Sequence, residues 1–129
     1  MSAESGHPQG KNVPEARARA RAHLTLAEAL QVLAMGSEDF AVLFEHGTLK
    51  MEIYRPRGVD PQQPHGRDEV YVIASGHGFF VNGDVRHAFG TGDVLFVPAG
   101  AVHRFEGFSE DFSTWVMFYG PKDGERDDG

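Results

Sequence analysis

The chain has 129 residues, of which 40% are hydrophobic and 24% are charged, so it fits one globular domain and not a disordered polymer. It contains no cysteine, which excludes a disulfide framework, a thiolate metal site and a cysteine nucleophile. The formal net charge of −7 disfavours a nucleic-acid partner. No apolar run could cross a bilayer or act as a secretory signal, so we expect no membrane partner and a cytoplasmic location.

The N-terminal part of the chain predicts a flexible segment followed by one helix. Residues 1–22 are polar and are expected to be flexible. The sequence Thr25-Leu26-Ala27-Glu28 is a capping box, which indicates a helix start. Apolar residues then recur at helical spacing: Leu26, Leu30 and Leu33. Gly36 ends this pattern, so we expect a short helix over about residues 25–35 that packs on a sheet.

The remainder of the domain reads as a series of short strands. Turn residues divide it into eight apolar segments: 40–45, 48–55, 69–75, 79–81, 85–89, 94–97, 103–106 and 112–119. Asn82-Gly83 is a strong hairpin signal, and a further turn is expected over Gly76-His77-Gly78. This pattern predicts a β-sandwich or barrel over residues 23–120, with an acidic flexible tail over 121–129.

Two segments carry residues with metal-ligand chemistry. In extended geometry Gln63, His65, Arg67 and Glu69 lie on one side of the chain, and His65 and Glu69 can converge on one cation. A buried strand further along ends in a Pro-Ala-Gly turn, after which His103 begins the next strand. A barrel could bring His103 beside the first pair. Two imidazoles and one carboxylate suit iron, manganese, nickel or zinc and leave coordination positions open.

Both segments resemble the paired motifs of the cupin superfamily, at residues 63–76 and 92–107. The matching residues of the first motif are His65, Glu69 and Gly76, and those of the second are Gly92, Pro98, Gly100 and His103. The resemblance implies an all-β, single-domain jelly-roll barrel, here with a short N-terminal helix. It also implies one divalent transition metal at the centre of the barrel, held by His65, Glu69 and His103.

The sequence departs from the motifs at three positions. Arg57 replaces the opening glycine and Gly107 replaces the closing asparagine, which are changes in loops. Gln63 occupies the place of the first motif histidine, and an amide oxygen is a weaker ligand than imidazole. Gln63 is therefore a candidate fourth ligand, a hydrogen-bond partner for a metal-bound water, or a residue that leaves the site three-coordinate.

Three further residues are candidates for the wall of a substrate pocket. His87 shares strand parity with Phe89 and could line the barrel cavity. Trp115 lies in an aromatic strand of which alternate residues face inward. Arg67 could bind a carboxylate or phosphate on a ligand. Together they favour a small organic molecule as the binding partner.

The function expected from this combination is a metal-dependent enzyme acting on a small organic molecule. Dioxygenase-like oxidation comes first, because two histidines and a carboxylate leave room for both substrate and O₂ on iron. Isomerase or lyase chemistry on the same ligands is the next alternative. A non-catalytic module that binds a metal or small ligand, or a barrel with a vestigial site, is the third. Exposed sheet edges also favour a homodimer that shares residues 40–55.

Overall fold

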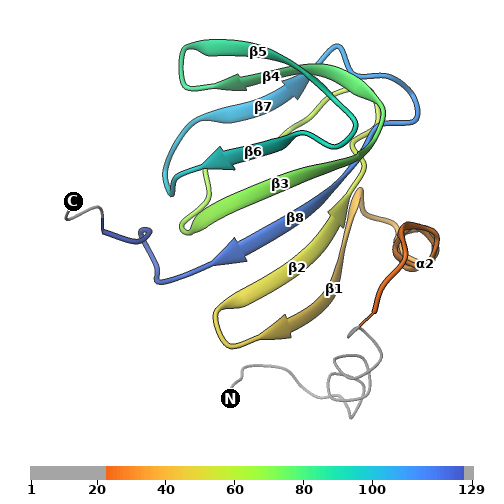
Figure 1. The fold of residues 1–129 in the computed structure, drawn as a ribbon, viewed down its shortest axis with the longest axis horizontal. Coiled ribbons are helices and arrows are strands. Elements are labelled where there is room, and N and C mark those ends of the chain that lie inside the picture. The colour runs from red at the N-terminus through yellow and green to blue at the C-terminus, as the bar shows by residue number, and fades with distance from the viewer. Residues whose placement is uncertain (1–22, 127–129) are drawn as a thin grey trace.

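The computed structural model describes residues 23–126 of the chain (Figure 1). Within them lie one helix and eight strands: α2 (Leu26–Ala34), β1 (Phe40–His46), β2 (Leu49–Tyr54), β3 (Asp68–Ser75), β4 (His77–Asn82), β5 (Val85–Gly90), β6 (Val94–Val97), β7 (His103–Glu106) and β8 (Ser113–Tyr119). The predicted all-β fold with a short N-terminal helix is confirmed. The segment 1–22, predicted to be flexible, lies outside the described residues.

The strands form two antiparallel sheets that face one another (Figure 1). One sheet has five strands in the order β1-β2-β8-β3-β6, and the other has three in the order β5-β4-β7. Inward side chains of both sheets make one aromatic core, which includes Tyr71, Phe80, Phe89 and Phe105, and Phe112 joins it from the position before β8. This is the jelly-roll arrangement, in which each strand alternates between the core and the outside.

The chain changes sheets at Gly76, between β3 and β4. The turn expected over residues 76–78 is shorter than predicted, because β4 already begins at His77. Gly76 has a φ of 88°, and a Cβ there would lie 2.6 Å from the Cα of Phe112. Only glycine meets both conditions. This bend carries the chain from the five-stranded sheet into the three-stranded sheet without a loop.

Helix α2 covers the outer face of the first hairpin. The capping box between Thr25 and Glu28 is present as predicted. Buried residues of the helix pack on outward side chains of β1 and β2 in a second cluster: Ala29, Leu33, Leu43 and Ile53. β1 is an edge strand of its sheet, and the homodimer through residues 40–55 stays a prediction. Among the described residues, no helix is long and apolar enough to cross a membrane.

Strand register places a row of chemically active side chains on the inner face of the five-stranded sheet. Lys50 of β2 pairs with Phe118 of β8, which in turn pairs with Glu69 of β3. The neighbouring inward row, set by the same pairings, consists of Glu52, Val116 and Tyr71. One end of the barrel interior therefore carries both acidic and basic groups beside aromatic rings.

The first residues after β8 return to the start of β3. The backbone N–H of Asp123 donates to the carbonyl of Gly66 at 2.6 Å, and that of Glu125 donates to Oδ2 of Asp68 at 2.7 Å. These bonds attach residues 121–126, the first part of the predicted tail, to the loop that precedes β3. Residues 127–129 lie outside the described residues.

Candidate metal centre

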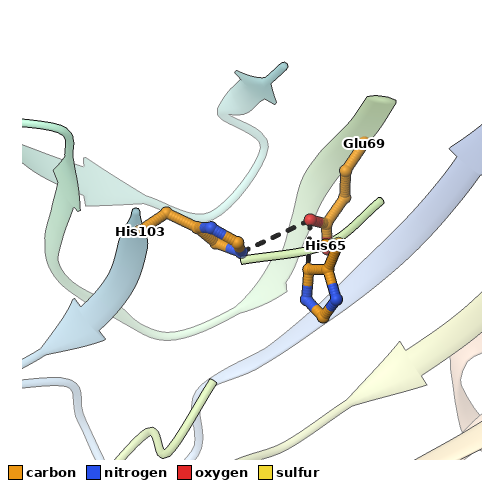
Figure 2. Close-up of side chains that lie close together, drawn as sticks. All are labelled: His65, Glu69 and His103. Carbon is orange, nitrogen blue, oxygen red and sulfur yellow. Dashed lines mark ion pairs between the residues drawn. The ribbon is translucent and has the colours of Figure 1, made fainter. Parts of the chain in front are cut away.

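Three residues from two distant parts of the chain meet inside the barrel (Figure 2). His65 comes from the loop before β3, Glu69 from β3, and His103 from the first position of β7. Nε2 of His103 lies 3.4 Å from Oε1 of Glu69, and Nε2 of His65 lies 3.9 Å from the same oxygen. Their candidate ligand atoms all lie within 4.8 Å of one another. The structure thus brings together the three residues that the two sequence motifs single out.

Three of the candidate ligand atoms in this group are buried without hydrogen-bond partners. Both carboxylate oxygens of Glu69 and Nε2 of His103 are in this state. Buried polar atoms in native proteins almost always have a partner, and leaving one unpaired costs about 1–3 kcal/mol. A divalent cation with bonds of about 2.0–2.2 Å would satisfy all three atoms after small side-chain movements. The residues present therefore fit a transition metal.

Hydrogen bonding and burial set the state of the two histidines. Nδ1 of His103 donates to the carbonyl of Ala101 at 2.9 Å, which aims Nε2 at Glu69. Burial lowers the pKa of His103, but the Glu69 carboxylate and the Ala101 carbonyl outweigh it and leave that pKa raised. Burial lowers the pKa of His65 against the opposing charge of Glu69. His65 therefore offers a neutral ring, whereas a proton on His103 competes with a cation.

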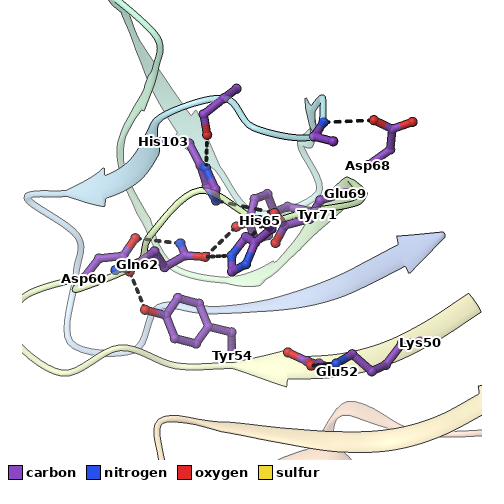
Figure 3. A network of polar contacts seen from close by, with 12 residues as sticks. Lys50, Glu52, Tyr54, Asp60, Gln62, His65, Asp68, Glu69, Tyr71 and His103 are labelled. Atoms are coloured by element: carbon purple, nitrogen blue, oxygen red, sulfur yellow. Dashed lines mark hydrogen bonds and ion pairs between the residues drawn. The ribbon is translucent and has the colours of Figure 1, made fainter. Parts of the chain in front are cut away.

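The amide beside the three residues belongs to Gln62 and not to Gln63 (Figure 3). Oε1 of Gln62 lies 3.1 Å from Nε2 of His65 and accepts from the hydroxyl of Tyr71 at 3.0 Å. Gln63 is exposed. Residues 61–67 form no strand, so the alternation that put Gln63 and His65 on one side does not apply there. Gln62 therefore occupies the position beside the site that was predicted for Gln63.

Asp60 holds Gln62 in this orientation. It is buried, and its carboxylate accepts from Nε2 of Gln62 at 2.8 Å and from the backbone N–H of Phe105 at 2.8 Å. It also accepts from the hydroxyl of Tyr54, whose pKa is raised by burial and by this carboxylate. Because Asp60 can only accept, the amide nitrogen of Gln62 must face it, and the amide oxygen must face His65.

A cavity of about 320 Å³ opens onto two of the three residues, His65 and Glu69. His65, Glu69 and Gln62 line one side of it, and Lys50 and Glu52 of β2 line another. Nζ of Lys50 lies 3.5 Å from Oε2 of Glu52. Burial raises the pKa of Glu52, and Lys50 opposes that shift. The cavity thus holds a carboxyl group that can exchange a proton closer to neutral pH than an ordinary glutamate.

The structure places the three residues predicted for the pocket wall in three different locations. Trp115 does not reach the cavity: it packs outside, against the cluster under α2, because Val116 and Phe118 hold the inward positions of β8. His87 is exposed and lines a separate cavity between β5 and β6. Arg67 lines a second cavity that also contacts His65. Of the three, only Arg67 lies beside the candidate metal centre.

Several residues of the site were not predicted from the sequence. Lys50 and Glu52 share strand parity with Tyr54, and that alternation is the signal that could have placed them on the inner face. Asp60 and Gln62 lie in a loop between β2 and β3, where no periodic pattern shows which way a side chain points. Their roles became visible only in three dimensions.

Comparisons with known proteins agree with the fold. A family model described as "Cupin domain" matches residues 50–119, more than half of the chain. An uncharacterised protein of Streptomyces coelicolor is 40% identical over 63 residues, which are 49% of this chain and 60% of that protein. The matched part therefore spans about 60% of that relative's length.

Solved structures share the fold at low sequence identity. A cupin-2 domain containing protein from Shewanella frigidimarina is 12% identical, with a TM-score of 0.60 over 78% of this chain and 98% of that one. KdgF from Halomonas sp. is 15% identical, with a TM-score of 0.56 over 65% of this chain and 81% of that one. At these identities the likeness concerns the fold alone.

The unpaired state of Glu69 predicts an unusual effect on stability. In metal-free protein, at a pH above the raised pKa of His103, Glu69→Gln should leave the free energy of unfolding unchanged or raise it. The variant removes a buried charge, and the new amide can donate to Nε2 of a neutral His103. Urea unfolding in the presence of a chelator measures this.

The adjacent carboxylate is a matched control. Asp68 is also buried, but it accepts from the backbone N–H of Ala99 at 2.9 Å and from that of Glu125. Asp68→Asn should therefore lower the free energy of unfolding by about 1–3 kcal/mol, since an amide nitrogen would face a donor. Equal losses in both variants would mean that Glu69 has a structural role like that of Asp68.

Proposed function

The chain belongs to the cupin family, and from that premise we propose that it is a metal-dependent enzyme that oxidises a small organic molecule with O₂. His65, Glu69 and His103 are the proposed ligands of one divalent transition metal. The observation that carries the proposal is the convergence of these three side chains beside a cavity, with both carboxylate oxygens of Glu69 and Nε2 of His103 buried without hydrogen-bond partners. A site kept only for stability would have paired these atoms within the protein.

The donor set supports oxidation over purely structural metal binding. Two imidazoles and one carboxylate, with coordination positions left for ligands, supply Lewis acidity and, with iron, redox chemistry with O₂. The protein's own residues would do the rest. Val116 and Phe118 line the cavity and limit water beside the site, and the Ala101 carbonyl fixes the ring of His103.

Gln62 has a proposed role beside the three ligands. Asp60 aims the amide oxygen of Gln62 at His65, so the oxygen already lies beside the proposed ligands. We assign to Gln62 the role that the motif comparison gives to Gln63: an oxygen that either completes the ligand set or holds a water there. Tyr71, which donates to the same oxygen, keeps that side chain in place.

Glu52 supports isomerase or lyase chemistry as the second candidate. Its carboxyl group lies on the cavity wall, and burial raises its pKa. A carboxyl group in that state can remove a proton from a substrate and return it. This reaction needs no O₂, and so the two candidates differ in a measurable way. A non-catalytic binding module would show neither reaction.

Metal content is the first test of the proposal. Protein purified without chelator or nickel resin should carry about one transition metal per chain, as expected for a single three-ligand site. His65→Ala and His103→Ala should lose it, whereas His87→Ala, an exposed histidine outside the site, should keep it. Elemental analysis by mass spectrometry measures this. Wild-type protein that neither carries nor takes up metal would contradict the proposal.

Oxygen consumption is the second test. Iron-loaded protein mixed with pools of small organic molecules should consume O₂ with at least one pool, and His103→Ala should not. An oxygen electrode records the rate, and the matched His87→Ala variant should retain it. Turnover of a substrate without O₂ uptake would instead establish the isomerase or lyase candidate. No turnover in metal-loaded protein would leave the binding module.

A further inference from the structure

A second cavity of about 290 Å³ adjoins the first and is rich in positive charge. The two cavities share Lys50, His65 and Phe118, so they adjoin at one of the three candidate ligands, His65. Arg67 and Lys122 complete the basic wall of the second cavity. The chain as a whole carries a net charge of −7. Three cationic side chains around one cavity therefore stand out against the acidic background.

Arg67 is held in this wall with part of its guanidinium unsatisfied. Its Nε donates to the carbonyl of Gly120 at 3.2 Å, which fixes the direction of the side chain. One Nη atom is buried and has no hydrogen-bond partner. A buried donor that carries positive charge is costly to leave unpaired. The group that removes this cost is an anionic acceptor, with which arginine forms short, strong bonds.

Lys50 connects this wall to the metal centre. Strand register places Lys50 in one row with Phe118 and Glu69. The backbones of Lys50 and Glu69 are two strand spacings apart, or about 10 Å. Its Nζ lies 5.4 Å from the centre of the Phe118 ring, and Glu52 is its ion-pair partner. Its side chain is one-third exposed, so a ligand in the cavity can reach it. Lys50 thus borders both cavities.

We propose that these two cavities form one binding site for a small organic carboxylate. The carboxylate group would lie between Arg67 and Lys50, with Lys122 at the opening, and the reacting end would lie at His65 and Glu69. This inference rests on the proposed function, for which it names the substrate class. Each cavity is near the lower end of the usual size range of ligand sites, which restricts the ligand to a small molecule.

The test uses succinate, a molecule with carboxylates at both ends, and succinamide, a neutral molecule of the same length. Calorimetric titration of metal-loaded protein should show succinate binding at least tenfold tighter than succinamide. Lys50→Met and Arg67→Gln should each weaken succinate binding about tenfold, with unchanged metal content. Arg67→Lys should recover part of the loss, because it keeps the charge.

Arg55→Gln is the matched control for the loss of one positive charge. Arg55 is exposed and lines a different cavity, so succinate should bind this variant as it binds wild type. Thermal unfolding of each variant checks the fold, and Arg67→Lys covers the case in which Arg67→Gln unfolds. Equal binding of succinate and succinamide, or equal succinate binding by all variants, would overturn the carboxylate site.

Two further measurements separate this inference from the proposed function. Acetate titrated into metal-free protein should shift the amide NMR signals of residues around Arg67 in wild type but not in Arg67→Gln, because the basic wall exists without metal. Absence of metal together with such shifts would contradict only the proposed function. Tighter binding of inorganic phosphate than of succinate, with the same dependence on Arg67, would overturn the assignment to a carboxylate.

Discussion

The structure depends on one constraint: a carboxylate, Glu69, lies in the middle of the barrel with no hydrogen-bond partner for either oxygen. It is 1% exposed, and nearly all buried carboxylates are paired or coordinate a metal. Two histidines face it, His65 from the preceding loop and His103 from a distant part of the chain. The fold brings these three side chains together: the chain changes sheets at Gly76, and the hydrogen bond to the Ala101 carbonyl orients His103. A bound cation would make this arrangement favourable.

A second group of residues keeps the neighbouring polar atoms paired, in contrast with Glu69. Asp60 is also a buried carboxylate, but it accepts hydrogen bonds from Tyr54, Gln62 and the backbone N–H of Phe105. The carboxylate that orients the site is therefore satisfied within the protein, whereas the carboxylate at its centre is not. This difference between two buried acids separates positioning residues from candidate ligands. Because Asp60 accepts from the amide nitrogen of Gln62, the amide oxygen of Gln62 faces the site.

Most of the fold and the three central residues could be predicted from the sequence, because turn residues and fixed motif spacings are local signals. The strands lie within a few residues of their predicted bounds, and the capping box forms as expected. The errors arose where the alternation of side chains was assumed outside a strand, or where the sequence did not show which residues of a strand face inward. Gln63 lies in an irregular loop, and Trp115 is outward because Val116 and Phe118 are inward. Those directions depend on tertiary packing.

The measurement that tests the central claim most directly is anomalous diffraction from a crystal of metal-loaded protein, recorded on both sides of the metal absorption edge. The account predicts one strong anomalous peak inside the barrel, at about 2.0–2.2 Å from nitrogen atoms of His65 and His103 and from a carboxylate oxygen of Glu69. A peak elsewhere in the molecule, or none between these three side chains, would contradict it.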